Sequence, residues 1–497
     1  MINVVWFKRD IRITDHQPLV EASKLGPVLP IYVAEPSIWK EADLSSRHFQ
    51  FVWESLLDLS ENLSKTGSKL FVAIAEVEEV LAAIYEKHGP FRLFAHEENG
   101  TPITFARDLR VHEWMKERSL PFTEFQHFGV VRKLKSRNTF QEKWEDFMSR
   151  NILPAPKKLE LVRDVPSNLS SDLHLLRDFV VKGRPILQGQ RGGESNAIQV
   201  LNSFLDYRFQ SYNVHISKPY SSAESCSRLS SYLAWGNISM RTVVHQTRQA
   251  LEQTTNSFHK KQLTAFISRI HWHCHFIQRL ESDPEIMTKP INAAYDTIRT
   301  KWDEEACQRW FYGKTGIPLV DAAMRCLHET GWVNFRTRAM LVSFVCNTLL
   351  LDWRRPSMGL AQLFLDYEPG IHFSQVQMQA GTTGFNTIRV YNPIKMGKNH
   401  DPNGAFVRRF VKELVDVPDE YIHEPWLYEE FDTLGYPEPM VDIVEANRRA
   451  RDVLYRVKRS EEAREISKEQ LDKHGSRMRR ESRKKKTEKP EQLSFDL

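Results

Sequence analysis

The stretch Asn3-Val4-Val5-Trp6-Phe7-Lys8-Arg9-Asp10-Ile11-Arg12 opens with a short apolar run and then turns polar. A short apolar run that ends at polar residues is typical of a buried β-strand. Thr14-Asp15 and Pro18 follow. This combination favours the start of a helix, because the side chains cap free backbone N–H groups and proline presets φ. The opening residues therefore predict a strand that leads directly into a helix.

The same alternation continues through the first part of the chain. Apolar runs at residues 28–33, 69–75, 91–95 and 122–128 are separated by helical patterns, which predicts a parallel sheet with helices on both faces. From Ser195 onward the pattern is helical, with apolar residues three to four positions apart in 266–280, 318–327 and 335–353. Four parts are predicted: an α/β domain at 1–130, a connector at 131–194, a helical domain at 195–440, and a charged helix with a basic tail at 441–497.

The net charge of +5 is concentrated near the C-terminus. Residues 473–489 hold nine Lys or Arg side chains against Glu481 and Glu488, a net of +7, so the rest of the chain carries −2. A basic tail is suited to nucleic acid or to an acidic partner, and a merely solvated tail is the alternative.

Cysteines, glycines and hydropathy argue against several classes of protein. The five cysteines are scattered without a Cys-x-x-Cys pair, which disfavours a disulfide framework, a zinc site and an iron–sulfur cluster. No Gly-x-Gly-x-x-Gly follows the first strand, so a dinucleotide would be bound in the helical half. Apolar runs are too short for a membrane span, and the N-terminus lacks a cleavable leader. A cytoplasmic, monomeric protein without a membrane partner is expected.

Four stretches, in order along the chain, resemble the cryptochrome/photolyase family. They are 4–12; Cys226-Ser227-Arg228-Leu229-Ser230 before a helical pattern; 310–325, continuing through Trp332 and Arg338 to Asp352-Trp353-Arg354; and Arg389-Val390-Tyr391-Asn392-Pro393, followed by His423-Glu424-Pro425-Trp426. The resemblance implies an α/β, Rossmann-like antenna domain with a parallel sheet and an all-α FAD-binding domain. In the second domain FAD is held folded into a U.

The resemblance also implies which residues bind FAD. They are Tyr212, Cys226, Ser227, Arg228, Leu229, Ser230, Asn334, Arg338, Asp366, Tyr367 and Glu368. Serine hydroxyls and backbone N–H groups at a helix start suit a pyrophosphate, although a serine-rich N-cap would look the same. Arg338 and Asp366 match the family's Arg–Asp pair near the flavin, and a purely structural salt bridge is the alternative. Glu368 stands where the family has a second Asp.

The predicted catalytic positions are Trp272, His273, Arg269 and His372. In the family's photolyases, the excited, reduced flavin passes an electron to a pyrimidine lesion flipped out of the duplex. Trp272 matches a wall on which the lesion stacks, although a lone Trp in a helical pattern is otherwise core. Arg269 stands where dimer-repairing members have Glu, and His273 where they have Arg. His372 or its neighbour Phe373 falls at the position that faces flavin N5.

Further departures affect electron transfer. Trp302 and Trp353 match the distal and middle members of the family's tryptophan chain, and Val376 falls where the proximal member is expected. There is no Trp from residue 354 to 425. The standard relay is therefore expected to be broken, with Tyr391 or another aromatic as a substitute. Two core tryptophans are the alternative interpretation.

His271 and His275 share one helical face at a spacing that suits a metal. No carboxylate completes the set nearby in sequence, so no metal is predicted. We expect at least one hydrogen-bonded core histidine in this cluster and one or two histidines facing the flavin.

Three functions remain open. A light-driven lyase that repairs ultraviolet lesions in DNA is favoured, and a cryptochrome-type photoreceptor or a flavoprotein with neither role are the alternatives. The last six residues, Gln492-Leu493-Ser494-Phe495-Asp496-Leu497, resemble a bacterial sliding-clamp-binding peptide, which favours repair. The resemblance further implies a folate or deazaflavin antenna in the first domain.

Overall fold

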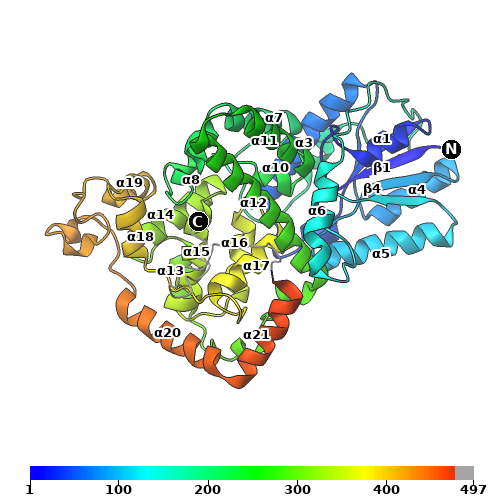
Figure 1. Cartoon of the computed structure of the whole chain (residues 1–497). Helices are drawn as coiled ribbons and strands as arrows, with labels where there is room; N and C mark the ends of the chain where they lie inside the picture. The colour runs from blue at the N-terminus through cyan, green and yellow to red at the C-terminus, as the bar shows by residue number, and fades with distance from the viewer. Residues whose placement is uncertain (476–497) are drawn as a thin grey trace.

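The computed structural model describes residues 1–475, and Figure 1 shows a sheet domain joined to a larger helical part. The predicted opening strand forms β1 (Asn3–Phe7), and all its residues are buried. The other strands are β2 (Val28–Ala34), β3 (Phe71–Ile74), β4 (Arg92–His96) and β5 (Phe122–Phe125). They pair in parallel in the order β3-β2-β1-β4-β5. The predicted parallel sheet is confirmed.

Alternate residues of β1 face opposite layers of the sheet domain. Val5 and Phe7 share a core with α1 (Gln17–Ser23) and α3 (Ser46–Lys65). Val4 and Trp6 share a second core with α4 (Val77–His88) and α5 (Pro102–Glu117). Because side chains alternate along a strand, a central strand covered on both faces must be apolar at successive positions. The continuous apolar run in the sequence has this cause.

Helices make up most of the remaining described chain. They are α2 (Pro36–Trp39), α6 (Phe140–Ser149), α7 (Glu194–Asp206), α8 (Tyr212–His215), α9 (Ser222–Ser225), α10 (Ser230–Ala234), α11 (Met240–Gln253), α12 (Ser257–Ser282), α13 (Glu304–Phe311), α14 (Pro318–Thr330), α15 (Phe335–Ser343), α16 (Arg354–Leu363), α17 (Pro369–Ala380), α18 (Pro393–His400), α19 (Ala405–Phe410), α20 (Ile443–Arg459) and α21 (Glu461–His474). Within residues 1–475, none of the helices has both the length and the apolar character that a membrane crossing requires.

Three predicted helices differ from the observed ones in their boundaries. α12 extends beyond 266–280 on both sides, and Asn256 caps its start by accepting hydrogen bonds from the N–H groups of Phe258 and His259. The helix predicted over 335–353 ends with α15, after which the chain forms a π-helical turn at Phe344–Thr348. The charged helix predicted after 441 is split, because the Ser460 hydroxyl caps a second helix, α21.

The loop after β1 joins the sheet domain to the helical part. Arg241 of α11 donates hydrogen bonds to both carboxylate oxygens of Asp15, at 2.5 and 2.9 Å. Gly236, just before α11, has φ +70, and a Cβ there would lie 2.0 Å from the carbonyl oxygen of Arg9. Only glycine fits at this close backbone contact. The junction therefore fixes the two parts against each other.

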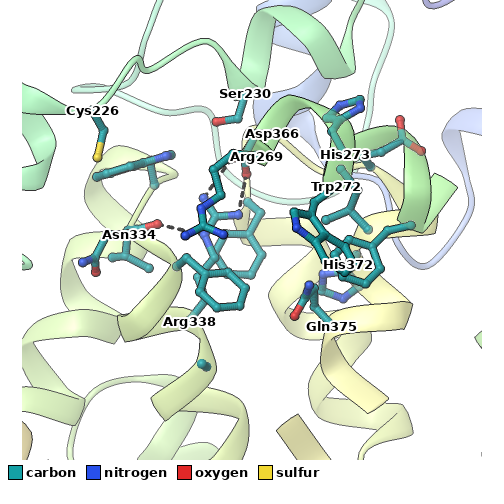
Figure 2. A pocket seen from close by; sticks show the side chains of 18 of the residues that line it. Cys226, Ser230, Arg269, Trp272, His273, Asn334, Arg338, Asp366, His372 and Gln375 are labelled. Carbon is teal, nitrogen blue, oxygen red and sulfur yellow. Dashed lines mark hydrogen bonds and ion pairs between the residues drawn. The ribbon is translucent and has the colours of Figure 1, made fainter. Parts of the chain in front are cut away.

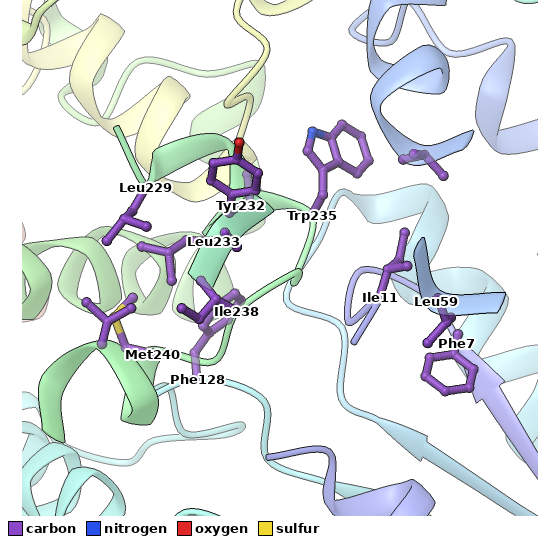
Figure 3. Close-up of a cluster of buried hydrophobic side chains, with 14 of the residues drawn as sticks. Phe7, Ile11, Leu59, Phe128, Leu229, Tyr232, Leu233, Trp235, Ile238 and Met240 are labelled. Carbon is purple, nitrogen blue, oxygen red and sulfur yellow. The ribbon is translucent and has the colours of Figure 1, made fainter. Parts of the chain in front are cut away.

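One hydrophobic core runs through this junction. Figure 3 shows members from the first part of the chain, Phe7, Ile11, Leu59 and Phe128, and members from the helical part, Leu229, Tyr232, Leu233, Trp235, Ile238 and Met240. The helical members belong to the segment that also carries the predicted FAD-binding loop. The sheet domain therefore supports that loop directly.

Candidate functional site

A cavity of about 320 Å³ lies in the helical part, among α10, α12, α15 and α17 (Figure 2). Every predicted FAD-binding and catalytic residue except Leu229 lines it: Tyr212, Cys226, Ser227, Arg228, Ser230, Arg269, Trp272, His273, Asn334, Arg338, Asp366, Tyr367, Glu368 and His372. The fold thus gathers residues from distant parts of the sequence. A concave, mainly apolar cavity with a few polar groups is the usual form of a cofactor site.

The loop at 226–230 is held in a strained conformation. Arg228 has φ +60, in the left-handed region that residues with side chains rarely adopt. Its guanidinium lies 3.8 Å from the centre of the Trp332 ring, and its carbonyl accepts a hydrogen bond from Gln190 at 2.8 Å. Arg208 donates hydrogen bonds to the carbonyl oxygens of Cys226 and Ser227. Strain held in place by several contacts is common at ligand-binding loops.

Leu229 is the predicted FAD-binding residue that does not line the cavity. Its side chain is buried in the core of Figure 3, so only its backbone is left for a ligand. Leu229 also occupies the N-cap position of α10, without a side-chain hydrogen bond. The serines of this loop therefore do not cap the helix. The Ser230 side chain instead lies beside Asp366, where it helps to lower the pKa of that carboxyl group.

The predicted ion pair between Arg338 and Asp366 forms at the cavity wall. Two hydrogen bonds join the guanidinium to the carboxylate, at 2.9 and 2.8 Å (Figure 2). Burial alone would raise the pKa of Asp366, but Arg338 and Ser230 hold it below its ordinary value. Arg338 Nε also donates to the Val333 carbonyl at 2.8 Å. The pair is thus a fixed, ionised element of the site.

The wall formed by α12 carries Trp272. Its ring centre lies 5.7 Å from that of Phe276, and both side chains line the cavity. Burial lowers the pKa of His273 to about 4, so this ring is neutral at pH 7. Arg269, one turn earlier, places its positive charge near Tyr212 and opposes the rise in the pKa of that buried phenol. A flat apolar wall beside a cation suits a stacked nucleobase.

His271 and His275 do not line the cavity. The His271 ring packs 5.0 Å from that of Trp144, and Nδ1 of His275 is hydrogen-bonded to Arg137 at 2.7 Å. The expected hydrogen-bonded core histidine is therefore confirmed in His275. His273 is the member of the cluster that faces the cavity.

His372 and Glu368 line the cavity near the start of α17. Nε2 of His372 hydrogen-bonds the Ser357 carbonyl at 2.9 Å, and burial lowers the pKa of His372 to about 4. Oε2 of Glu368 lies 3.5 Å from Nη2 of Arg9, and burial raises the pKa of Glu368 to about 7. This wall therefore presents a neutral imidazole and a carboxyl group that titrates near neutral pH.

Trp302 and Trp353 do not line the cavity. Trp353 is buried, with the guanidinium of Arg354 5.2 Å from its ring centre. Trp302 is partly exposed and donates a hydrogen bond to Glu304 at 2.9 Å. Val376 does line the cavity, so the wall is aliphatic where the family places an aromatic link. The electron-transfer role of the two tryptophans stays a prediction.

Several cavity residues were not predicted. They are Ile216, Phe276, Trp332, Val333, Ala339, Val342, Phe364, Ile371, Gln375, Met378 and Gln379. Three of them lie three or four positions after a predicted residue on the same helix: Phe276 after Trp272, Val342 after Arg338 and Gln375 after His372. This helical spacing was the available signal.

The sheet domain contains a buried cluster, Asp10, His16 and His96, that sequence analysis did not single out. Oδ2 of Asp10 lies 2.9 Å from Nε2 of His16 and 2.7 Å from Nδ1 of His96. Burial lowers the pKa of His96 to about 3. The three side chains form hydrogen bonds that brace the ends of β1 and β4.

The residues around the cavity fit FAD. Arg228 offers a cation within the loop predicted to hold the pyrophosphate, and aromatic rings such as Trp272 and Phe276 also line the cavity. Buried polar atoms without a hydrogen-bond partner among the described residues include Nε of Arg269, Nδ1 of His273 and Oε1 of Glu368. Since buried polar atoms are normally paired, these atoms indicate a polar ligand. A dinucleotide with a flat ring system meets both requirements.

Comparison with known proteins agrees with this site. Residues 3–156 match the family described as DNA photolyase, and residues 266–456 match the FAD binding domain of DNA photolyase. A deoxyribodipyrimidine photo-lyase of Streptomyces griseus is 30% identical over 471 residues, covering 90% of this chain and 98% of that protein.

Solved structures share the fold. A bacterial class III photolyase from Agrobacterium tumefaciens has a TM-score of 0.79 and 26% identity, with 92% of this chain and 98% of that chain covered. A cryptochrome from Synechocystis sp. PCC6803 has a TM-score of 0.79 and 22% identity, with 91% and 99% covered, which shows the fold alone.

The parallel-sheet domain, the helical domain and the cavity define a two-domain FAD-binding protein. The chain belongs to the cryptochrome/photolyase family. The fold class implied by the sequence resemblance is confirmed.

Proposed function

We propose that this protein is a light-driven DNA-repair lyase that acts on ultraviolet-induced pyrimidine lesions. One observation carries the proposal: the cavity that gathers the FAD-binding residues also presents Trp272, a flat wall for a flipped base, on α12. The relatives named deoxyribodipyrimidine photo-lyase support it. FAD, when bound, supplies the absorption of light and the transferable electron.

The chain's own residues bind FAD and orient the flipped base. Arg228, Ser227 and the 226–230 backbone hold the pyrophosphate. The Arg338–Asp366 pair fixes polar groups at the flavin. Trp272 would stack on the flipped pyrimidine. Arg269 would balance the negative charge that the pyrimidine gains with the transferred electron. These assignments rest on the cavity lining and on the family positions.

A repair assay tests this function. Purified protein with chemically reduced FAD is mixed with two oligonucleotides, one carrying a cyclobutane dimer and the other a six-four lesion. Blue light should restore at least one of them, and darkness should restore neither. FAD-loaded, fully reduced protein that restores neither lesion in light would contradict the proposal and favour a cryptochrome-type photoreceptor.

Trp272→Ala should weaken binding of lesion-bearing DNA by about 1–3 kcal/mol, the contribution of one base–aromatic stack. Affinity for damaged DNA, measured by fluorescence anisotropy and normalised to FAD content, checks this. Trp272→Phe keeps a flat ring and should recover most of the affinity. Equal losses in both variants would assign Trp272 to the core and not to the substrate.

A contact with the DNA backbone is proposed beside the cavity. Phe335 lines the cavity, and Arg336 follows it directly in α15. Burial lowers the pKa of His400, and the nearby charges of Arg336 and Lys218 lower it further. These basic groups therefore lie close together, as phosphate contacts require.

A folate or deazaflavin antenna is proposed for a second cavity, of about 70 Å³, at the carboxyl ends of β1, β2 and β4. Trp6, Trp39 and Trp235 line it, and aromatic rings suit a flat chromophore. A site of this size encloses only part of such a chromophore, since cofactor cavities typically measure about 300–1,000 Å³. Mass spectrometry of small molecules released from the purified protein tests the assignment.

The sliding-clamp contact through Gln492 to Leu497 is proposed on sequence grounds, and these residues lie outside the described part of the chain. Deleting the six residues should abolish clamp capture in a pull-down. A cytoplasmic location and a monomeric state complete the proposal.

A further inference from the structure

Tyr367 lines both the FAD cavity and the second cavity, and it is 1% exposed. Its hydroxyl donates a hydrogen bond to Oδ2 of Asp43 at 2.5 Å. Its ring centre lies 5.4 Å from that of His372, which also lines the FAD cavity. A phenol paired with a buried carboxylate thus adjoins the proposed flavin site.

We propose that Tyr367 is the electron donor that photoreduces bound FAD, with Asp43 as the acceptor of its phenolic proton. The proposal rests on FAD occupying the cavity, as proposed above. An electron donor is needed here because Val376, an aliphatic residue, lines the cavity where the family places the proximal tryptophan of its relay.

In each step Tyr367 loses one electron and one proton. Light absorbed by oxidised FAD draws one electron from the phenol, the O–H bond breaks, and the proton passes to the Asp43 carboxylate. Tyr367 is left as a neutral radical. A thiolate in the buffer returns the electron and becomes a thiyl radical, and Asp43 returns the proton. Two such cycles deliver the two electrons of full reduction.

Because Tyr367 is buried, its oxidation requires the paired carboxylate of Asp43 as a base. The pKa of Tyr367 is held well above its ordinary value, first by desolvation and then by Asp43, so the phenol keeps its proton until it is oxidised. Oxidation without a base would leave a positive charge in a buried site, which is costly. Burial also raises the pKa of Asp43, which makes its carboxylate a stronger base.

Other charged and titratable groups surround the pair. Arg9 faces both Tyr367 and Asp43, Glu368 faces Tyr367, and Glu41 faces Asp43. His48 stacks on Tyr367 with ring centres 6.0 Å apart. Burial lowers the pKa of His48 to about 3, so its ring is neutral at pH 7. Asp43 is therefore the base in hydrogen-bond contact with the phenol.

The radical should stay on Tyr367. Trp235 lies 5.5 Å from His48 and is stacked 6.1 Å from Trp39, so aromatic rings continue away from the cavity. However, the Arg9 guanidinium lies 4.6 Å over the Trp235 ring. A fixed cation there disfavours the positive charge of an oxidised indole. The oxidised side chain is then a tyrosine and not a tryptophan.

The experiment uses FAD-loaded protein in blue light with a thiol and no DNA. Asp43→Asn should slow photoreduction on the order of 10²-fold, the usual loss when a positioned proton acceptor is removed. Tyr367→Phe removes the electron donor itself and should slow photoreduction at least as much. The control is Tyr436→Phe. Tyr436 is also buried and donates to Asp321 at 2.5 Å, but it does not line the FAD cavity. It should photoreduce at the wild-type rate.

Three further readouts separate this role from a structural one. Transient absorption should show a tyrosyl radical in wild type and lose it in Tyr367→Phe. Photoreduction should be slower in deuterium oxide, and its rate should fall as acid protonates Asp43, with a midpoint above the ordinary Asp pKa of about 3.9. Asp43→Asn should remove this pH dependence.

A normal rate in Tyr367→Phe, or a tryptophanyl radical that disappears in Trp353→Phe, would overturn the proposal in favour of the tryptophan relay. Repair by chemically reduced wild-type protein needs no photoreduction. Its failure would reject the proposed function without bearing on Tyr367.

Discussion

Asp366→Ala should empty the cavity of FAD and lower the free energy of unfolding by about 3 kcal/mol, near the lower end of the range for breaking a buried ion pair. The variant leaves the Arg338 guanidinium without the carboxylate that receives its two hydrogen bonds. It also removes the carboxyl group whose pKa Ser230 helps to lower. FAD content is read from the absorption of the purified protein, and stability from urea unfolding of protein prepared without FAD.

Glu413→Ala is the matched control. Arg325 makes two hydrogen bonds to Glu413, at 2.7 and 2.9 Å, and its side chain is 24% exposed, the same as that of Arg338. The Glu413 side chain is 30% exposed, whereas that of Asp366 is 4% exposed. Since exposed pairs contribute about 0–1 kcal/mol, the control should lose little stability and keep FAD. Equal losses in the two variants would contradict the role given to burial.

The same pair has a pH signature. The pKa of Asp366 is lower in the folded than in the unfolded state. The ionised carboxylate therefore contributes fully to the free energy of unfolding above the unfolded pKa of about 3.9, and this contribution is lost as the pH falls through the folded-state pKa. The stability difference between wild type and Asp366→Ala should therefore shrink in acid. A difference that grows below pH 4 would mean that the carboxylate is not stabilised by Arg338.

Gly236→Ala should prevent correct docking of the two parts of the chain. Its Cβ would lie 2.0 Å from the Arg9 carbonyl oxygen and 2.4 Å from Cα of Asp10. These are backbone atoms, so relief requires a shift of the whole junction. The left-handed conformation costs about 1 kcal/mol and overpacking about 1–3 kcal/mol more. We expect a lower unfolding midpoint and little FAD, measured by thermal unfolding and absorption.

Gly435→Ala separates backbone conformation from contact. Gly435 has a φ of +66, close to the +70 of Gly236, and no atom lies within 4 Å of a Cβ built there. This variant should lose only about 1 kcal/mol, the conformational part. If Gly435→Ala and Gly236→Ala lose the same stability, the close approach at the junction is not the cause.

The sequence predicted the features that depend on local pattern. The apolar run from Val4 to Phe7 predicted a buried strand, and the structure shows it as β1 with both faces covered. The pairing of Arg338 with Asp366 followed from matched positions, since both residues belong to family motifs. Local periodicity and short motifs carry this kind of information.

Features set by distant contacts were not predictable. The π-helical turn after α15 forms where Asn347 donates a hydrogen bond to the Gln379 carbonyl at 3.0 Å, a contact with no local signal. The left-handed conformation of Arg228 and the inward turn of Leu229 depend on packing against the sheet domain. The contact between Tyr367 and Asp43 joins residues 324 positions apart.

The core that crosses the junction has a consequence for how the protein is made. Phe7 and Ile11 leave the ribosome long before Leu229 and Trp235, their partners in one core (Figure 3). The surface of the sheet domain that packs against the FAD-binding loop therefore stays uncovered until more than 200 residues have been synthesised. Contacts at such separation slow folding, because chain closure must precede their formation. FAD loading should accordingly be a late event of biosynthesis, and the helical part produced alone should fail to assemble its cofactor loop.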